Sequence, residues 1–217
     1  MKVLIAVISY YGDALNGAHQ AIRDTWGKDL SDLRFFMPRL ARYTPQRDEV
    51  FLDVLHDYDC ISHEVREIMR WSIREGYDFT FFCCNDLYII PKKLFACGFE
   101  QYDYAGVFYP SDVPIGKTFT FNWNGKPIEN MTPWAAGGWG WFLSKKASER
   151  VVAVETNWAS AGDIYVGHAL SPAILNGEIV AKEIVLNNGI CWHYRHDTDK
   201  TYNPATGWMQ QMYKEHQ

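Results

Sequence analysis

The sequence predicts an α/β fold in which a mostly parallel central sheet is flanked by helices, and three observations lead to this prediction. Continuous apolar runs such as Val3–Ile8 and Phe79–Cys84 are typical of strands that are covered on both faces. Segments with a helical spacing of apolar residues alternate with these runs in the first half of the chain, as in proteins with parallel sheets. The length of 217 residues fits a single domain, 1–217, of this class.

In the first half of the chain, the ends of the expected elements coincide with glycine or proline. The elements expected there are a strand at 3–8, a helix at 16–26, a strand at 33–36, a helix at 61–76 and strands at 79–84 and 87–90. Gly27 and Gly76 end the two helices, because glycine is common directly after a helix. Pro38 follows the second strand, and Pro91 begins a short helix because proline suits the first helical turn.

In the second half, a strand-like segment at 103–108 precedes a hairpin. The arms of the hairpin are 118–123 and 126–128, and the Asn124-Gly125 pair between them favours a type I′ turn. The remaining expected elements are helices at 145–154 and 163–170 and strands at 184–186 and 190–193.

Charge and composition narrow the class of protein. The net charge of −5 disfavours broad nucleic-acid binding, because phosphate binding needs a basic surface. Aromatic residues make up 16% of the chain, and besides building a core, Trp and Tyr rings can stack on a sugar or a nucleobase. A nucleotide-binding protein with a phosphate-cradling glycine loop is not indicated, since neither Gly-x-Gly-x-x-Gly nor Gly-x-x-x-x-Gly-Lys-Ser/Thr occurs.

Cysteine usage and hydropathy predict a cytoplasmic protein. The five cysteines are odd in number and include no Cys-x-x-Cys pair, which disfavours a disulfide framework and fits a reducing compartment. The apolar run at the N-terminus is too short to cross a bilayer, and polar residues follow it at once. No later segment is apolar for long enough, so we expect no transmembrane segment; the sequence does not predict an oligomeric state.

Polar side chains follow two of the expected strands at the points where these strands end. Ser9 comes after the first strand, and Asn85 and Asp86 come after a central one. In parallel sheets ligands bind beyond the carboxyl ends of the strands, so these residues are candidates for ligand binding. Asp86 could bind a divalent ion that neutralises a diphosphate leaving group, or it could simply cap a turn; its position leaves both interpretations open.

A glycine-rich stretch with tryptophans, 135–141, is a second candidate for ligand binding. Gly137 and Gly138 would let the backbone approach a ligand closely, and Trp139 could stack on a sugar or base. The alternative interpretation is a bulged or tightly packed strand.

Three further residues carry candidate chemistry in the last third of the chain. Asp163 could take the proton of an acceptor hydroxyl as a general base, or it could be a plain helix N-cap. His193 could complete a metal shell, and Arg195 could meet a phosphate. His193 could equally be a satisfied core histidine. A zinc site with Cys191 lacks a second pair of ligands at zinc spacing.

Taken in order, five stretches of the chain resemble motifs of the β-1,3-glycosyltransferases of the Fringe and β-1,3-galactosyltransferase type, glycosyltransferase family 31. The stretches are Ile22-Arg23-Asp24-Thr25-Trp26, Asp57-Tyr58, Cys84-Asn85-Asp86, Ala136-Gly137-Gly138-Trp139-Gly140-Trp141 and Gly162-Asp163-Ile164-Tyr165-Val166-Gly167. His193 is similar in placement to the family's C-terminal metal-binding histidine. The resemblance covers most of the chain, residues 1–196.

This resemblance implies a GT-A fold, a UDP-sugar donor, a divalent cation that is usually manganese, and inversion at the anomeric carbon. Carried over to this chain, it makes Asp163 the general base and Asp86 and His193 the metal ligands. Gly138 and Trp139 would line the donor and acceptor pocket. Arg23 and Trp26 would brace the first helix against the sheet.

The chain departs from the family pattern at three points. Cys84 and Asn85 stand where the family has the first two acids of an acidic triplet, which puts metal dependence in question. Gly162 replaces the acid before the expected base. The membrane anchor and disulfides of the eukaryotic members are not expected either, so we predict a short bacterial, phage or viral enzyme of the cytoplasm.

Several functions fit these residues. The first is sugar transfer to a saccharide, a lipid-linked glycan, a protein side chain or a small metabolite. A variant is transfer to hydroxymethylated pyrimidines of phage DNA, which would need a basic groove that the net charge of −5 does not favour. A second class is a non-catalytic carbohydrate-binding protein on the same scaffold, which the loss of two acids supports.

Overall fold

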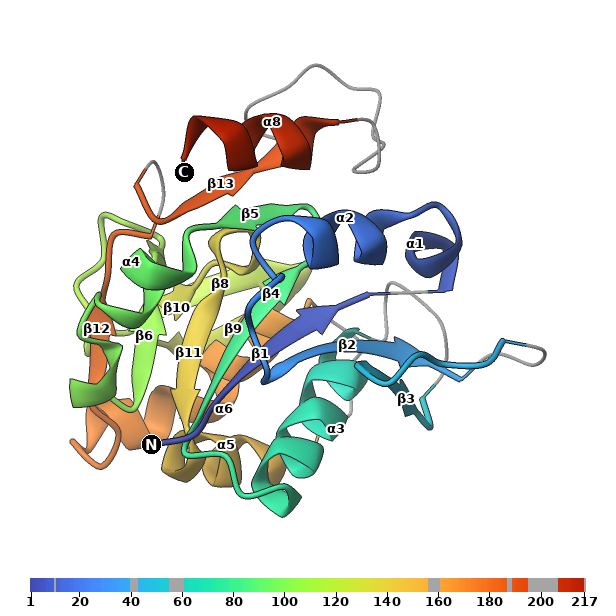
Figure 1. The fold of residues 1–217 in the computed structure, drawn as a ribbon. Coiled ribbons are helices and arrows are strands. Elements are labelled where there is room, and N and C mark those ends of the chain that lie inside the picture. Colours follow the sequence, from blue (N-terminus) through green and yellow to red (C-terminus); the bar gives the residue numbers. More distant parts are fainter. Residues whose placement is uncertain are drawn as a thin grey trace.

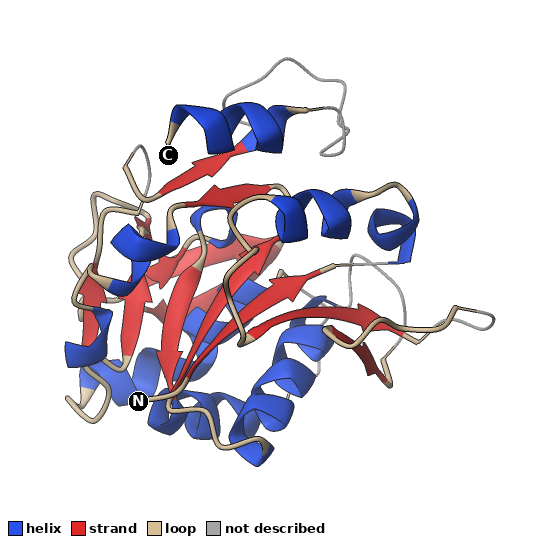
Figure 2. Ribbon diagram, in the orientation of Figure 1, coloured by secondary structure: helices blue, strands red, loops and turns tan. Residues whose placement is uncertain are grey.

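The computed structural model describes residues 1–9, 11–39, 43–54, 61–155, 161–186, 189–194 and 207–216. Figure 1 shows a central sheet with α3, α5 and α6 on one side and α2, α4 and α8 on the other. The sequence prediction of an α/β fold with a largely parallel sheet flanked by helices is confirmed. Figure 2 shows the same layering by secondary structure.

The central sheet has seven strands in the order β12-β6-β11-β4-β1-β2-β3. In chain order these strands are β1 (Val3–Ile8), β2 (Leu33–Pro38), β3 (Glu49–Leu52), β4 (Phe79–Cys84), β6 (Tyr104–Gly106), β11 (Trp141–Ser144) and β12 (Ala181–Glu183). β11 runs antiparallel to both of its neighbours, β4 and β6, and every other neighbouring pair is parallel.

Three two-stranded sheets lie around this sheet. They consist of β5 (Leu87–Ile89) with β13 (Cys191–His193), β7 (Phe108–Tyr109) with β10 (Trp134–Ala135), and β8 (Phe119–Trp123) with β9 (Lys126–Met131). The expected hairpin is the last of these. Asn124 and Gly125 have φ angles of 50° and 78°, as the predicted type I′ turn requires.

The helices have the following bounds. They are α1 (Tyr11–Leu15), α2 (Ala18–Asp24), α3 (Ile61–Arg74), α4 (Pro91–Phe95), α5 (Lys145–Val152), α6 (Gly162–Leu175) and α8 (Trp208–Glu215), with 3-10 turns η2 (Phe99–Gln101) and η3 (Gly137–Trp139). Within the described ranges, no helix has the length and apolar character that crossing a bilayer requires.

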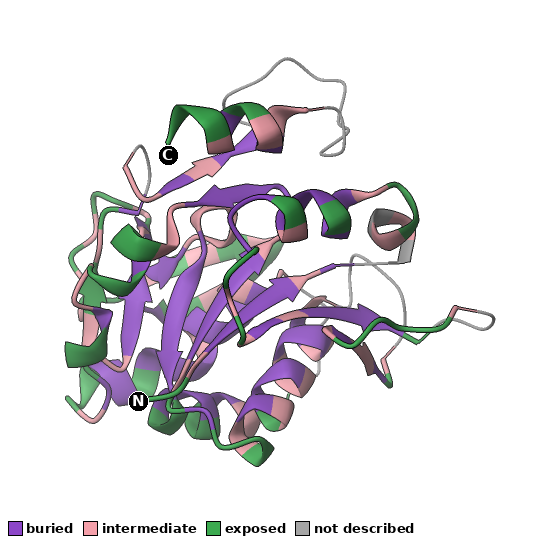
Figure 3. Cartoon of the chain, in the orientation of Figure 1, coloured by how far each residue is buried: buried purple, intermediate pink, exposed green. Residues whose placement is uncertain are grey.

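Alternate residues of the strands enter two different cores. Figure 3 shows that the strands of the central sheet are buried along most of their length. In β1, Leu4 and Ala6 join the core beneath α3, α5 and α6, whereas Ile5 and Val7 join the core beneath α2, α4 and α8. The continuous apolar run of β1 is therefore explained by burial on both faces.

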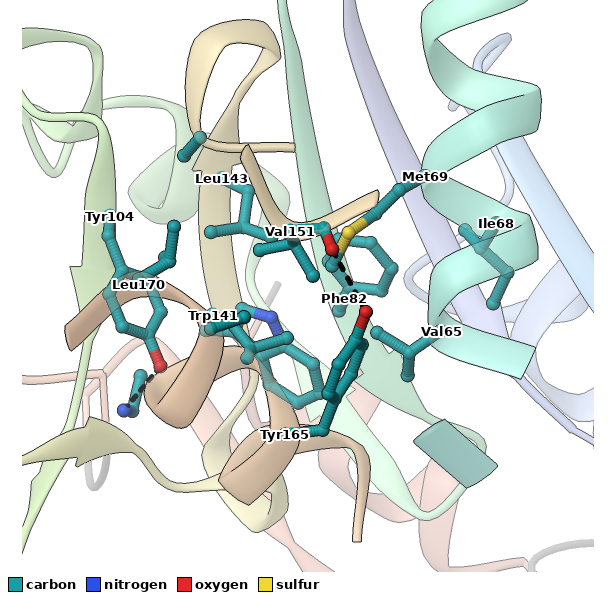
Figure 4. Close-up of a cluster of buried hydrophobic side chains, with 14 of the residues drawn as sticks. Val65, Ile68, Met69, Phe82, Tyr104, Trp141, Leu143, Val151, Tyr165 and Leu170 are labelled. Carbon is teal, nitrogen blue, oxygen red and sulfur yellow. Dashed lines mark hydrogen bonds between the residues drawn. The ribbon is translucent and has the colours of Figure 1, made fainter. Parts of the chain in front are cut away.

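Figure 4 shows how aromatic residues fill the first of these cores. The rings of Phe82 and Trp141 stack at 5.3 Å across β4 and β11. Tyr165 and Tyr104 keep their hydroxyls satisfied, because Tyr165 donates to the Val151 carbonyl at 2.9 Å and Tyr104 accepts from the Ala135 N–H at 2.7 Å. Each such buried side chain contributes about 1.5–3 kcal/mol by leaving water.

Several predicted boundaries in the N-terminal half need correction. The helix expected at 16–26 is the shorter α2, which begins at Ala18 because Gly17 before it has a left-handed φ of 90°. The short helix α1, which precedes it, was not predicted. The strand expected at 33–36 continues to Pro38 in β2. β3, which has only four residues and was not predicted, joins the sheet through β2.

Two boundaries in the C-terminal half were also wrong. The strand expected at 184–186 is β12, three residues earlier, where the polar Lys182 and Glu183 are exposed at the edge of the sheet. The segment 103–108 is divided between β6 and β7, which pair with different partners.

Candidate active site

The carboxyl ends of β1 and β4 lie side by side, since Ile8 is the register partner of Cys84. Ser9 and Asn85, which follow these strands, are both buried, with 7% of each residue exposed. The sequence prediction that these polar residues come together at one edge of the sheet agrees with this arrangement. It places them where open parallel sheets bind ligands.

Asp86 and His193 meet although almost half of the chain separates them. β13 runs antiparallel to β5 with His193 opposite Leu87, which carries the histidine to the turn after β4. His193 Nε2 lies 3.4 Å from Asp86 Oδ2, and both residues are 6% exposed. The N–H of Tyr194 donates to the Asp86 carbonyl at 3.0 Å, which fixes β13 against this turn.

The glycine-rich stretch forms η3, a single turn that packs beside the Asp86–His193 pair. The ring of Trp139 lies 6.0 Å from the ring of His193, at 61°. Gly140 has a φ of 78°, and a Cβ there would lie 2.4 Å from the Phe81 ring. Glycine is therefore required for the turn to approach β4 so closely, and the bulged strand that was an alternative for this stretch is not formed.

Asp163 lies at the other end of η3, in the first turn of α6. Its Oδ2 accepts a hydrogen bond from the Gly137 N–H at 2.8 Å, and its Oδ1 accepts one from the Ile164 N–H at 2.9 Å. The N-cap of α6 is Ala161, so the alternative interpretation of Asp163 as the cap is wrong. A Cβ at Gly162 would lie 2.6 Å from Val65, so the departure from the family pattern at this position allows α6 to pack closely on α3.

The environment of Asp163 acts on its pKa in two directions. Burial raises the pKa above its ordinary value of 3.8, whereas the hydrogen bonds from Gly137, Ile164 and the Trp134 side chain lower it; the raising effect is the larger. The side chain still keeps part of its surface accessible, as do the three residues of η3. A partly accessible carboxylate with a raised pKa is a stronger base than an ordinary aspartate.

One short turn thus connects the two acidic positions that the sequence singled out. Gly137 contacts Asp163 at the start of η3, Trp139 contacts His193 at its end, and His193 meets Asp86. Gly138 lies between them. Arg195 and the Asp57-Tyr58 motif fall outside the described residues.

The Asp86–His193 pair is suited to a divalent cation. A carboxylate oxygen and an imidazole nitrogen at 3.4 Å are close enough to bind the same ion, and this pair of donors is compatible with several divalent metals. Within the described ranges, no group of three or more His, Cys, Asp or Glu residues is arranged to hold a metal. An ion bound here would therefore take further ligands from elsewhere, such as water and the substrate.

Ser9 belongs to a hydrogen-bonded network that the sequence did not indicate. Ser9 Oγ lies 2.7 Å from His19 Nε2, and His19 Nδ1 lies 2.9 Å from Glu49 Oε1. Burial lowers the pKa of His19, although Glu49 opposes this effect. The imidazole is therefore neutral at pH 7, and it donates its Nδ1–H to Glu49 and accepts at Nε2 from the Ser9 hydroxyl.

Glu49 is the centre of this network. Its side chain is fully buried, and it accepts hydrogen bonds from His19, from Arg23 at 2.8 Å, from the Tyr43 hydroxyl at 2.8 Å and from the Gln46 N–H at 2.8 Å. Burial alone would raise the pKa of Glu49, but these hydrogen bonds lower it to about 2. Arg23 also forms a two-point ion pair with Asp48, so it ties α2 to β3 as the family resemblance implied for a structural residue.

Glu64 is a second buried acid that the sequence did not single out. It lies in the first turn of α3 with 5% of the residue exposed, and burial raises its pKa to about 8. The carboxyl group is therefore mostly protonated at pH 7. The only hint in the sequence is its position beside apolar residues of the helix.

Comparison with solved structures identifies proteins of similar fold. The inositol-1-phosphate CTP transferase from T. maritima has a TM-score of 0.50 at 11% identity, over 99% of this chain and 97% of that chain. A protein assigned as a nucleotide-diphospho-sugar transferase from Desulfovibrio desulfuricans has a TM-score of 0.48 at 12% identity, over 84% and 80%. One assigned as a glucose-1-phosphate thymidylyltransferase from Bacillus anthracis, in complex with a sucrose, has a TM-score of 0.43 at 10% identity, over 94% and 97%.

At these identities the similarity establishes the fold and nothing finer. The chain shares its α/β fold with the CTP transferase from T. maritima, and this agrees with the GT-A-like fold that the resemblance implied. No protein-family model and no curated protein sequence matches it.

Proposed function

We propose that the chain is a glycosyltransferase that moves a sugar from a UDP-sugar to an acceptor hydroxyl with inversion, as a member of a family-31-like group acting in the cytoplasm. One observation carries the proposal: Asp163 and the Asp86–His193 pair lie at the two ends of the same turn, η3. In this proposal the turn would hold the base and the site for the diphosphate next to each other. The GT-A-like fold and the order of the sequence motifs support the same function.

In this proposal Asp163 is the general base. It would take the proton of the acceptor hydroxyl as that oxygen attacks the anomeric carbon. The hydrogen bonds from Gly137 and Ile164 hold the carboxylate in one orientation, so that its exposed edge faces the acceptor. Attack from the side opposite to the departing diphosphate inverts the anomeric carbon. A well-placed base contributes about 10²–10⁴-fold to the rate.

Asp86 and His193 would hold the divalent cation, manganese or a similar ion. Such an ion, when bound, neutralises negative charge on the diphosphate. Asn85 is an amide where the family has an acid, so the pocket carries less negative charge and we expect weaker metal binding. Gly138 and Trp139 would contact the sugar, with Ser9 and Arg195 completing the donor site.

The test is an assay for UDP release from a panel of UDP-sugars, with and without manganese, in the presence of simple acceptor saccharides. We expect turnover with one donor, stimulation by manganese, and a glycoside of inverted anomeric configuration. Turnover with no donor or acceptor, together with sugar binding, would instead favour the non-catalytic carbohydrate-binding protein. A panel that includes hydroxymethylated DNA and a protein acceptor identifies the acceptor class.

Nucleotidyl transfer is the second candidate, since the CTP transferase from T. maritima has the highest TM-score of the three structures compared, 0.50. The two reactions release different products. A nucleotidyltransferase joins a nucleoside triphosphate to a sugar phosphate and releases pyrophosphate. A glycosyltransferase instead releases a nucleoside diphosphate. Measuring both products from matched substrates separates them.

A further inference from the structure

Trp134 lies directly before the turn that contacts Asp163, and its side chain is buried against α6. β10 leads through Ala136 into η3, so Trp134 and the Gly137 N–H belong to one short segment, 134–137. Trp134 is 4% exposed and packs in the same apolar cluster as Ile164, the residue after Asp163. This segment therefore supplies two donors next to the carboxylate of Asp163, the Gly137 N–H and the Trp134 indole.

Gly167 allows Trp134 to lie this close to α6. A Cβ at Gly167 would lie 2.3 Å from the Cβ of Trp134 and 3.4 Å from its Cα. These atoms are fixed by the backbone of β10, so glycine is required for the approach. Gly167 follows Asp163 by one helical turn and lies on the same face of α6, so the ring of Trp134 packs along the face that carries the carboxylate.

The indole N–H of Trp134 donates to the Asp163 carboxylate. Burial raises the pKa of Asp163, and the indole is one of the hydrogen-bond donors that oppose this effect. The indole nitrogens of Trp26, Trp123 and Trp141 differ, because they are buried without a hydrogen-bond partner among the described residues. The contact with a carboxylate therefore distinguishes Trp134 from other buried tryptophans of the chain.

Aromatic rings of the hairpin β8–β9 and of β7 hold the indole in place. The ring of Phe121 meets that of Trp134 at 4.8 Å and 63°, and the ring of Phe119 stacks on it at 6.2 Å. Tyr109 contacts the indole edge-on at 5.3 Å. A buried ring that three other rings contact has little freedom to rotate, so the N–H keeps its direction.

An indole is a neutral donor, and this property suits a base. Burial alone would raise the pKa of Glu49, but its hydrogen bonds, one of them from Arg23, lower it to about 2, so that carboxylate is a weak base. The donors to Asp163 carry no charge, and its pKa stays above the ordinary value. Trp134 thus orients the carboxylate without making it as weak a base as Glu49.

Few ionisable groups face Asp163 in the described part of the chain. β10 and η3 carry none, and α3 contacts the neighbouring Gly162 through the apolar Ile61 and Val65. Tyr104 of β6 interacts electrostatically with Asp163, but burial raises the pKa of Tyr104 well above its ordinary value, so its hydroxyl stays neutral near pH 7. The loss of one hydrogen-bond donor should therefore be visible in the titration of the carboxylate.

We propose that Trp134 is a positioning residue for Asp163: its indole N–H, held by the surrounding rings, fixes the carboxylate in the orientation in which it takes the proton of the acceptor hydroxyl. This inference rests on the proposed role of Asp163 as the general base. Trp134 acts through Asp163 and does not itself contact the substrate.

The first measurement is the titration of the Asp163 carboxyl carbon by ¹³C NMR, with the signal assigned by its loss in Asp163→Asn. Trp134→Phe keeps an aromatic ring but removes the N–H, so the pKa of Asp163 should rise further above its ordinary value. Because this variant also changes the size of the ring, a second variant replaces Trp134 by benzothienylalanine, which has a sulfur in place of the N–H and nearly the same shape. It should raise the pKa in the same direction.

The second measurement is the steady-state kinetics of sugar transfer. In both variants kcat should fall by roughly 10-fold with little change in KM for the UDP-sugar, since a base displaced by about 1 Å can lose about 10²-fold. The acidic limb of kcat/KM should move to higher pH. Trp123→Phe is the matched control, because it removes an indole N–H without a described partner from the same aromatic cluster. It should leave kcat and the Asp163 titration as in the wild type.

Three results would overturn the proposal. They are an Asp163 titration that is the same in the Trp134 variants and the wild type, an unchanged kcat where transfer is measurable, and an equal loss of kcat in Trp123→Phe, which would indicate packing rather than the N–H. Absence of turnover with every donor would count against the proposed function instead. The NMR titration would then still decide whether Trp134 holds the carboxylate.

Discussion

The pKa of a buried carboxylate is shifted in opposite directions in the network around Glu49 and in the site around Asp163. Glu49 accepts four hydrogen bonds, two of them from side chains that can carry positive charge, and its pKa is lowered to about 2. Asp163 accepts hydrogen bonds from backbone N–H groups, and burial raises its pKa. Glu64 is the extreme case, with its pKa raised to about 8 by burial alone.

This difference separates acids that stabilise the fold from acids that destabilise it when ionised. A carboxylate paired with a cation adds to the free energy of unfolding, whereas a buried acid without one reduces it at neutral pH. Residues retained at such a cost are candidates for chemistry. On this basis Glu49 is structural and Asp163 is functional, and four predictions test the comparison.

The largest effect is expected for Asp163→Asn, which keeps the shape of the side chain but removes the base. The rate kcat should fall by about 10²–10⁴-fold, while UDP-sugar affinity changes little. In the wild type, kcat/KM should fall with decreasing pH through the Asp163 pKa, which lies above its ordinary value. Steady-state kinetics across this pH range and UDP-sugar binding measure both effects.

Asp112→Asn, a change at an exposed aspartate, is the matched control and should leave kcat unchanged. If Asp163→Asn retained full turnover, or lost donor binding with kcat intact, Asp163 would not be the base.

The second-largest effect is expected for Glu64 and concerns how the free energy of unfolding depends on pH. Because its folded-state pKa of about 8 exceeds the ordinary 4.5, the folded chain holds the proton longer than the unfolded chain as pH rises. The free energy of unfolding should therefore decrease by about 4 kcal/mol between about pH 5 and about pH 9 from this group alone. Glu64→Gln should remove that decrease, as urea unfolding across this range would show.

Glu67→Gln, one turn nearer the centre of the same helix and half-buried, is the control and should keep the wild-type slope. Parallel curves for the wild type and Glu64→Gln would mean that the Glu64 carboxyl is not desolvated in solution.

Glu49→Gln should lower the free energy of unfolding at neutral pH, which is the opposite of the effect expected for Glu64→Gln. The lowered pKa of Glu49 contributes stability that is present above pH 4.5 and is lost as the pH falls towards about 2. The variant should therefore lose about 3 kcal/mol at pH 7, and its deficit relative to the wild type should shrink in acid. Urea unfolding at both pH values measures this, with the exposed Glu183→Gln as control. A deficit that does not depend on pH would indicate packing rather than charge.

The smallest effect is expected for Gly137→Ala. The added Cβ would lie 3.2 Å from Asp163 Oδ2, so the carboxylate must move by a few tenths of an ångström. Since a displacement of about 1 Å can cost about 10²-fold, we expect kcat to fall by roughly 2- to 10-fold. Gly189→Ala has open space around its Cβ and should have no effect on kcat. Equal kcat values for Gly137→Ala and Gly189→Ala would mean that the exact position of the Asp163 carboxylate does not affect catalysis.

β1 and β4 could be predicted because these strands are buried on both faces and are therefore continuously apolar. β11, the central strand at 141–144, was not predicted, because it directly follows the glycine-rich stretch. β3 could not be predicted either, since it has only four residues and begins with Glu49, a charged residue that hydrogen bonds hold in a buried position. For the same reason His19 gave no indication of its role: its contact with Glu49 depends on the pairing of β2 with β3.

The candidate site shows the same division. Asp86, His193 and Asp163 could be proposed as individual residues from strand ends and family motifs. Their convergence was implied by the family resemblance and by no local pattern, because it depends on the register of β13 on β5 and on the close approach of η3 to β4, which Gly140 permits. Local patterns predict elements, whereas contacts between distant segments arise from sheet register.

The most direct test of the central claim is a crystal structure of the chain soaked with UDP and manganese. We predict an ion bound by Asp86 and His193, a diphosphate beside the η3 turn, and the carboxylate of Asp163 facing the open acceptor side. UDP bound elsewhere, with no ion at Asp86, would contradict the account.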